Sequence, residues 1–439
     1  MTAAGARAAL GLTLGLGLGL GVCLGLGATG GLAAPAAAQS RRYPPAPVDK
    51  DAEDAAKSAL WNAATNPERH PYQDLVHTAR EALHQRTIDQ RAIAIARLGE
   101  AIALLPHEAE AYRWRGEAYF DAQDWAACAA DLAAADAYTQ RDDVPPGALA
   151  DLHRKLGICQ AHAGKLADAE TTLAETVTSG TASSTSPGET WMRLGEVRIA
   201  MGKLDEATTA LRAALDSSEP GPPALTHLLL ATAYDRARRP GDALLEASEG
   251  MRLDRALSTL YNPILPMLGP GDADYMLGLA FGAEPRPEFA LAYFRRFVAA
   301  VPDSPWRRRA EEHIRDARAA AMPETVVKTG SAAAEPEALR SPARRAMPQL
   351  RACLARRPTV VVQLAITKAG PRLPAGDRTH PHFHVEADSI VVHRAVGELS
   401  DDELDAIEGC MKPIAARLAL PVPHERDTYY TASFYVVGP

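Results

Sequence analysis

Paired small residues recur through the middle of the chain, and their spacing restricts the fold more than any other feature. In five places two small residues are twelve positions apart. Four positions after the second small residue, on the same face of its helix, comes a further residue that can pack at the next turn. Two helices of one hairpin cross closely only where small residues remove side-chain bulk. One such hairpin cannot bury its apolar side alone, so the spacing predicts a stack of hairpins. The pairs are Gly116 and Cys128, Gly157 and Ala169, Gly195 and Ala207, Ala231 and Ala243, and Gly278 and Ala290, followed by Leu132, Leu173, Leu211, Ala247 and Phe294.

The composition favours helices over a β-sandwich in this region. Hydrophobic residues make up 47% of the chain but aromatic residues only 5%. Alanine supplies much of the apolar content, and it loses no side-chain entropy in a helix. A β-sandwich needs more β-branched and aromatic residues. We therefore predict a helical repeat domain over residues 51–320. A degenerate sixth hairpin comes first, with its second helix at 88–105, and a polar terminal helix at 305–320 carries Arg307, Arg308 and Arg309 on a solvated face.

The third repeat matches a known family pattern. Residues 191–211 contain W-x2-L-G and then A-x3-L, close to the tetratricopeptide signature. The middle of the chain, about residues 73–320, therefore resembles the tetratricopeptide repeat family. Gln160 and Arg198 replace the usual aromatic residue in two repeats, and several connecting loops are longer than the family's. The resemblance implies an α-solenoid that binds other proteins.

The resemblance also implies a groove lined by the first helix of each repeat. At these positions the chain carries apolar residues and charges of both signs, without the basic clamp expected for a C-terminal carboxylate. Solenoids use such surfaces to hold extended peptides or helices. The predicted partner-binding residues are Arg113, Glu117, Phe120, Arg154, Ile158, Met192, Glu196, Leu228, Asp235, Tyr275 and Leu279.

The N-terminus has the pattern of a secretory signal. Arg7 precedes an apolar run at residues 10–26, and a stretch of small residues follows. This order predicts a signal peptide over residues 1–38, followed by a proline-rich linker over residues 39–50. An uncleaved anchor ranks lower because the run is glycine-rich and lacks a stop-transfer flank. Lipidation at Cys23 is a further alternative, although the residue before it is larger than a bacterial lipobox prefers.

The C-terminal segment, residues 346–439, has runs rich in valine, threonine and tyrosine that are typical of strands. After a linker at 321–345, we predict the order helix, strand, strand, helix, strand. The second helix should begin at Ser400, because a hydroxyl N-cap there precedes three acidic residues. The predicted strands are 359–367, about 383–393 and 428–437.

This order of elements resembles the TonB-like C-terminal domain of AgmX/PglI-type motility proteins. The resemblance rests on Cys353 in the first helix, Cys410 in the second, the strand at 360–366 and the Leu-Pro-Val-Pro stretch at 420–423. It implies a small α+β periplasmic interaction domain without chemistry of its own. We predict a Cys353–Cys410 disulfide, and two buried free thiols are the alternative.

The other cysteines of the exported chain, Cys128 and Cys159, belong to the repeats. Cys128 stands at a small-residue position, so we expect it to pack as a small apolar side chain. No cysteine lies in a CxxC motif, which argues against a thioredoxin-like site or a zinc ribbon.

One histidine cluster is the candidate for metal chemistry. His380, His382 and His384 alternate, so two of them could share a strand face, and His393 follows. The spacing fixes no carboxylate or cysteine ligand, so we expect an exposed polar strand edge without a metal. The sequence also lacks the motifs of serine hydrolases, zinc proteases and P-loop nucleotide binding.

These observations predict an exported protein–protein interaction scaffold of the cell envelope, located in the periplasm or outer envelope. The formal charge of −8 at pH 7 argues against nucleic acid as a partner, because phosphate binding needs a basic surface. We predict no enzyme activity, no cofactor, no small-molecule substrate and no transmembrane span after signal cleavage. The alternative is a metal-binding or enzymatic protein whose site is the histidine cluster.

Overall fold

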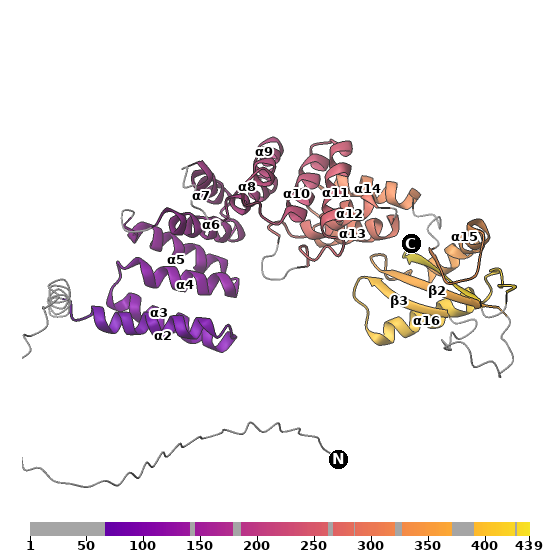
Figure 1. The fold of residues 1–439 in the computed structure, drawn as a ribbon, viewed down its shortest axis with the longest axis horizontal. Helices are drawn as coiled ribbons and strands as arrows, with labels where there is room; N and C mark the ends of the chain where they lie inside the picture. Colours follow the sequence, from indigo (N-terminus) through magenta and orange to yellow (C-terminus); the bar gives the residue numbers. More distant parts are fainter. Residues whose placement is uncertain are drawn as a thin grey trace, which may run out of the picture. The chain divides into compact units, whose positions relative to one another are not determined.

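The computed structural model of the chain describes residues 66–140, 145–178, 186–261, 267–284, 286–320, 327–370, 390–425 and 428–439. A stack of helices comes first along the chain, and a small sheet with two helices follows it (Figure 1). The fold is therefore mostly α, a tetratricopeptide-like α-solenoid followed by a small α+β segment, as the sequence predicted. The predicted signal peptide and the linker after it lie outside the described residues.

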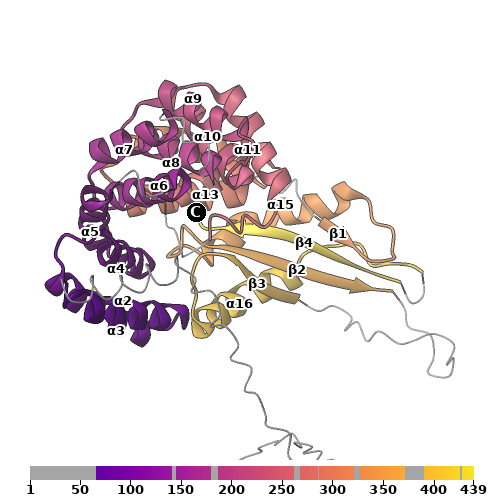
Figure 2. The same ribbon diagram turned by 60° about the vertical axis from the view of Figure 1, so that its left-hand side comes forward.

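The described part of the stack consists of six helical hairpins and one final helix. In Figure 2 the hairpins follow one another in sequence order, rising from indigo α2 and α3 to α9 and then passing through α10 and α11 down to α13. The predicted degenerate first hairpin is confirmed, since its second helix is α3. The hairpins are α2 (Arg69–His84) with α3 (Ile88–Leu104), α4 (Ala109–Ala122) with α5 (Trp125–Tyr138), α6 (Pro146–His162) with α7 (Leu166–Thr178), α8 (Pro187–Ala200) with α9 (Leu204–Leu215), α10 (Pro223–Arg236) with α11 (Pro240–Leu253), and α12 (Asp272–Ala283) with α13 (Pro287–Ala300); the final helix is α14 (Arg307–Ala320).

The glycines of the first helices lie where the spacing requires a small residue. A Cβ atom added to Gly195 of α8 would lie 2.5 Å from Cγ of Leu211 on α9, closer than real Cβ contacts allow. The leucine of the second helix therefore fills the space that the glycine leaves free. This contact explains the repeated spacing in the sequence. The same approach joins Gly116 to Leu132, Gly157 to Leu173 and Gly278 to Phe294.

Replacing Gly195 with alanine should destabilise the stack. We expect Gly195→Ala to lower the free energy of unfolding by about 1–3 kcal/mol, because overpacking forces Leu211 from its position. Gly99→Ala in α3 is the matched control, since the nearest atom to its added Cβ is Nη1 of Arg115 at 3.6 Å, an ordinary contact. At Gly99, the higher helix propensity of alanine should raise the free energy of unfolding by about 0.5–1 kcal/mol. Urea unfolding followed by circular dichroism measures both, and equal shifts in one direction would contradict the packing argument.

The C-terminal segment forms an antiparallel sheet with the strand order β1–β4–β2–β3. The two central strands pair along their whole length, from Val361 opposite Val437 to Ala369 opposite Tyr429. Alternate residues of β2 and β4 are buried in a core shared with two helices, because strand side chains point to opposite faces in turn. The strands are β1 (Val327–Thr329), β2 (Val361–Ala369), β3 (Ile390–Val396) and β4 (Tyr429–Val437), and the helices are α15 (Pro336–Ala352) and α16 (Asp401–Ala416).

The predicted order helix, strand, strand, helix, strand is confirmed in the described residues, and the sheet has one further strand before it. Most of the predicted strand at 383–393 lies outside the described residues, and β3 extends over Ile390–Val396. Strand β1 and the first part of α15 lie within residues 321–345, for which the sequence predicted a linker. Two prolines inside α15, Pro342 and Pro348, conceal its helical pattern. Strand β1 has three residues and pairs only with the distant β4, so no local pattern marks it.

The predicted start of the last helix is also confirmed. Ser400 caps α16: its side chain accepts the backbone N–H of Glu403, and the carboxylate of Glu403 accepts the backbone N–H of Ser400. This reciprocal pair satisfies two N–H groups that a helix start leaves without partners.

The stack and the sheet belong to one compact unit, residues 63–439, and share a core. The guanidinium of Arg295 on α13 donates hydrogen bonds of 2.8 Å to the backbone carbonyls of Pro358 and Gly438. Nearby, the ring of Phe289 meets that of Tyr435 edge to face, with centroids 4.7 Å apart. Helix α13 therefore contacts strands β2 and β4 directly.

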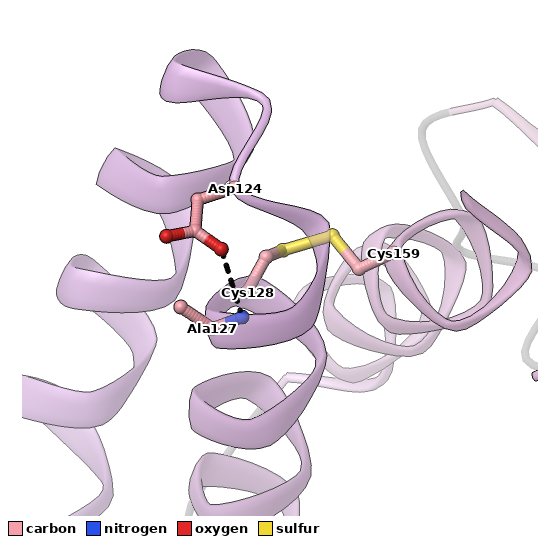
Figure 3. Close-up of a disulfide and its surroundings, with 4 residues drawn as sticks. All are labelled: Asp124, Ala127, Cys128 and Cys159. Carbon is pink, nitrogen blue, oxygen red and sulfur yellow. Dashed lines mark hydrogen bonds between the residues drawn. A yellow bond between two sulfur atoms is a disulfide. The ribbon is translucent and has the colours of Figure 1, made fainter. Parts of the chain in front are cut away.

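Two disulfides cross-link the described chain. Cys353, at the end of α15, bonds Cys410 of α16, which confirms the predicted pair. Cys128 of α5 bonds Cys159 of α6, so the expectation that Cys128 packs as a free thiol is wrong (Figure 3). Helix α5 packs both against its own hairpin partner and against the first helix of the next repeat. The twelve-residue spacing reveals only the first of these contacts.

Candidate functional site

The predicted groove residues fall into two groups by exposure. Arg113, Glu117, Phe120 and Arg154, on α4 and α6, are partly exposed. The others are buried inside the stack and have no open face to offer a partner. This buried group is Ile158, Met192, Glu196, Leu228, Asp235, Tyr275 and Leu279, none more than 8% exposed.

The buried carboxylate of Asp235 connects three helices near the C-terminal end of the stack. Asp235 of α10 is 1% exposed and accepts hydrogen bonds from the hydroxyl of Tyr275 at 2.5 Å and from Nη2 of Arg309 at 2.5 Å. The Nε2 of His313 donates to the same carboxylate at 2.9 Å. Burial raises the pKa of Asp235, but the hydrogen bonds from His313 and Arg309 outweigh it and lower the pKa to about 2. The carboxylate is thus ionised and occupied, and it links α10, α12 and α14.

The expectation of a solvated face for residues 307–309 is wrong for Arg309. Its side chain is 15% exposed and pairs with Asp235 and Glu312, whereas the Arg307 side chain is 48% exposed. Arg309 lies 74 residues from Asp235 in the sequence, so the pattern of α14 alone could not reveal this ion pair.

The carboxylate of Glu196 on α8 also accepts hydrogen bonds from within the chain. Its carboxylate accepts a hydrogen bond of 2.7 Å from Nη1 of Arg193 and one of 3.0 Å from the backbone N–H of Leu268. Leu268 comes from the long connection between α11 and α12, and its side chain packs among residues of α8. One of the extra loops of the sequence therefore covers the predicted groove at this repeat.

Ion pairs tie together the first helices at the other end of the stack. Lys155 of α6 lies 3.3 Å from Glu117 of α4, and Arg154 lies 3.0 Å from Glu189 of α8. Arg154 also bonds Asp151 within its own helix at 2.5 Å. The side chains of these pairs are 13–32% exposed, and each pair neutralises the charges that take part in it.

A small pocket of about 190 Å³ opens between α4, the end of α5 and α6. Arg113 stands at this pocket and, within the described residues, has no carboxylate at ion-pair distance. Its Nε is buried without a hydrogen-bond partner. Its guanidinium lies 5.3 Å from the ring centre of Trp114, which Arg80 contacts at 4.8 Å. The pocket is lined by Ala109, Glu110, Arg113, Thr139, Ala148, Leu149 and Leu152.

Only Arg113 of these lining residues is among the groove residues predicted from the sequence. Leu149 and Leu152 are spaced i, i+3 near the start of α6, and this apolar pair could have marked the pocket. Thr139 gave no such signal, because it follows the end of α5 and reaches the pocket only in the folded stack.

The histidine cluster cannot be placed by the structure. His380, His382 and His384 lie outside the described residues, and His393 belongs to β3. Among the residues that are described, no three histidine, cysteine or acidic side chains gather in a way that could hold a metal ion. No helix in the same part of the chain is long and apolar enough to span a bilayer.

Several solved structures of low sequence identity resemble part of this chain. No protein-family model and no curated protein matches the chain. PilW, a widely conserved type IV pilus biogenesis factor, is 14% identical over 54% of this chain and 96% of its own, with a TM-score of 0.37. YrrB, a TPR protein with an unusual peptide-binding site, is 17% identical over 46% and 97%, with a TM-score of 0.35. PilF of Pseudomonas aeruginosa is 13% identical over 58% and 99%, with a TM-score of 0.38. The tetratricopeptide-like assignment rests on the hairpins and their packing.

Proposed function

We propose that this protein is an exported interaction scaffold of the cell envelope that binds a peptide or protein segment on the first helices of its N-terminal repeats. The contrast between the two ends of the stack carries the proposal. Helices α4 and α6 keep a pocket and the partly exposed Arg113, which has no carboxylate at ion-pair distance among the described residues, whereas the carboxylates of Asp235 and Glu196 further along are already hydrogen-bonded. A partner therefore has an accessible surface at one end of the stack.

Two features support export to the periplasm or outer envelope. The N-terminal apolar run after Arg7 has the order of a secretory signal. The chain also pairs four of its cysteines in two disulfides, which persist in oxidising compartments. Lipidation at Cys23 is the alternative to cleavage after residue 38. The intact mass of the exported protein distinguishes the two.

The C-terminal segment would supply a second contact. Among the described strands, β3 is an outer strand of the sheet, and one side of its backbone pairs with none of the others. Such an edge can accept a strand from another chain. Two contacts on one chain are what a scaffold needs.

A capture experiment from an envelope extract tests the proposal. The variant Arg113→Glu should lower partner yield about tenfold relative to the parent protein, because it reverses the charge of a partly exposed arginine that has no carboxylate at ion-pair distance among the described residues. Arg252→Glu on α11 is the control, with a side chain 63% exposed, and should capture as the parent does. Arg154 is unsuitable because its side chain is 13% exposed and pairs with Asp151 and Glu189. Tyr275 is unsuitable for this test because it is buried.

Equal loss in both variants would show a nonspecific effect of charge and would contradict this site. A partner that both variants retain would place the contact elsewhere on the chain. Failure of the parent to capture any protein would remove the scaffold proposal itself.

A further inference from the structure

We infer that the pocket between α4 and α6 takes one large apolar side chain of a peptide, while Arg113 binds a single carboxylate on the neighbouring residue of that peptide. This inference rests on the proposed function and names the chemistry of its partner. Pocket shape, the unpaired guanidinium and a nearby acceptor each contribute to it.

The size and lining of the pocket suit a side chain better than a cofactor. Its volume of about 190 Å³ is below the roughly 300–1,000 Å³ of small-molecule sites. A dry cavity of about 150 Å³ accommodates benzene, so a phenyl or isobutyl group fits here. The hydroxyl of Thr139 donates to the carbonyl of Ala135 at 2.6 Å, so this donor is already used. The remaining uncharged lining is apolar: Ala109, Ala148, Leu149 and Leu152.

Arg113 differs from the other cations of α4 and α6. Arg115 is held by Asp131 through two hydrogen bonds of 2.6 and 2.8 Å, and Lys155 pairs with Glu117. Arg113 has only the ring of Trp114, and its buried Nε lacks a partner. Leaving a buried donor unsatisfied is unfavourable, and a guanidinium binds a carboxylate through two parallel hydrogen bonds. The free guanidinium therefore favours an acidic ligand.

Glu110 limits how acidic that ligand can be. It also lines the pocket, one helical turn before Arg113, and its carboxylate is 4.0 Å from Arg80. A second carboxylate on the peptide would meet like charge there. A backbone N–H of an extended peptide would instead find an acceptor. The site thus selects one acidic residue beside one large apolar residue, rather than an acidic run.

Selection from a random hexapeptide phage library on the full, oxidised protein tests this specificity. We expect the recovered peptides to place Leu, Ile, Met or Phe directly beside Asp or Glu. Fluorescein-labelled Gly-Gly-Phe-Asp-Gly-Gly then serves as the probe for anisotropy titration. Arg113→Gln should weaken its binding by about 10- to 100-fold, the range for a lost charged hydrogen bond. Arg252→Gln on exposed α11 should leave binding unchanged.

Two further comparisons separate the charge from the pocket. Replacing Asp by Asn in the probe should weaken binding to the parent protein but not to Arg113→Gln, since the two changes remove the same contact. Ala148→Phe should fill the pocket and weaken binding of the Phe probe, while a probe with Ala in place of Phe binds both proteins equally weakly.

Each outcome decides between the inference and the proposed function. Recovered peptides without the apolar–acidic pair, or equal affinity for parent and Arg113→Gln, would overturn the inference. Protein capture from the extract would still support the scaffold in that case. If neither peptides nor proteins bind, the inference about the pocket and the proposed scaffold function are both wrong.

Discussion

Replacing Asp235 with asparagine should lower the free energy of unfolding by about 3–5 kcal/mol. The carboxylate is 1% exposed, and its loss would leave the guanidinium of Arg309, only 15% exposed, without its main counter-charge. Removing one partner of a buried ion pair is strongly destabilising because the other charge stays buried. The change would also weaken the bond from the Tyr275 hydroxyl to the same oxygen. Urea unfolding followed by circular dichroism measures the loss.

The matched control is Asp242→Asn in the same hairpin. Asp242 pairs with Arg239, but their side chains are 43% and 49% exposed, so the pair is worth less than about 1 kcal/mol. We expect a change within about 0.5 kcal/mol. If both variants lose the same stability, the buried network is not what joins α14 to α10.

The same carboxylate predicts how stability depends on pH. Its pKa is lowered from the ordinary 3.8 to about 2 in the folded protein, so the folded state favours the ionised form. The resulting stabilisation is present above pH 4 and is lost as pH falls from about 4 to 2. By linkage, its size is about 2 kcal/mol. In the Asp235→Asn variant, the unfolding free energy should therefore change less over this interval than in the parent.

Local patterns in the sequence predicted the hairpins correctly for a physical reason. The contact between Gly195 and Leu211 lies within one hairpin, so its spacing is fixed by helix geometry and one short turn. The Ser400 cap is equally local, since it depends on four consecutive residues. Features of this kind can be derived from sequence because few degrees of freedom separate the residues involved.

The closed part of the groove could not be predicted in this way. Asp235 and Glu196 stand at family groove positions, but Arg309 of α14 binds the first carboxylate and the connection that carries Leu268 covers the second. The partners of Asp235 come from α12 and α14, 40 and 74 residues away. Sequence position assigns a residue to a helix face, whereas its exposure depends on every element that later packs there. The histidine cluster stays a sequence-based prediction.

Loss of the Cys128–Cys159 bond should destabilise the N-terminal repeats in particular. The two cysteines are 31 residues apart, and a loop of that length corresponds to about 3.5 kcal/mol of chain entropy in the unfolded state. Both side chains are fully buried, so Cys128→Ala/Cys159→Ala removes the packing of two sulfur atoms as well as the bond. In a solenoid each repeat contacts its neighbours, so the loss should concentrate at the interface of α5 and α6.

Hydrogen exchange measured by mass spectrometry locates this effect. We expect faster exchange in α5 and α6 of the double variant, and unchanged exchange in α15 and α16, which the other disulfide joins. Cys353→Ala/Cys410→Ala is the matched control and should show the reverse pattern. Because α6 supplies Leu149 and Leu152 to the pocket beside Arg113, the first variant should also bind the peptide probe less tightly. Uniformly faster exchange in both variants would show that the bonds act on the whole unit rather than on their own interfaces.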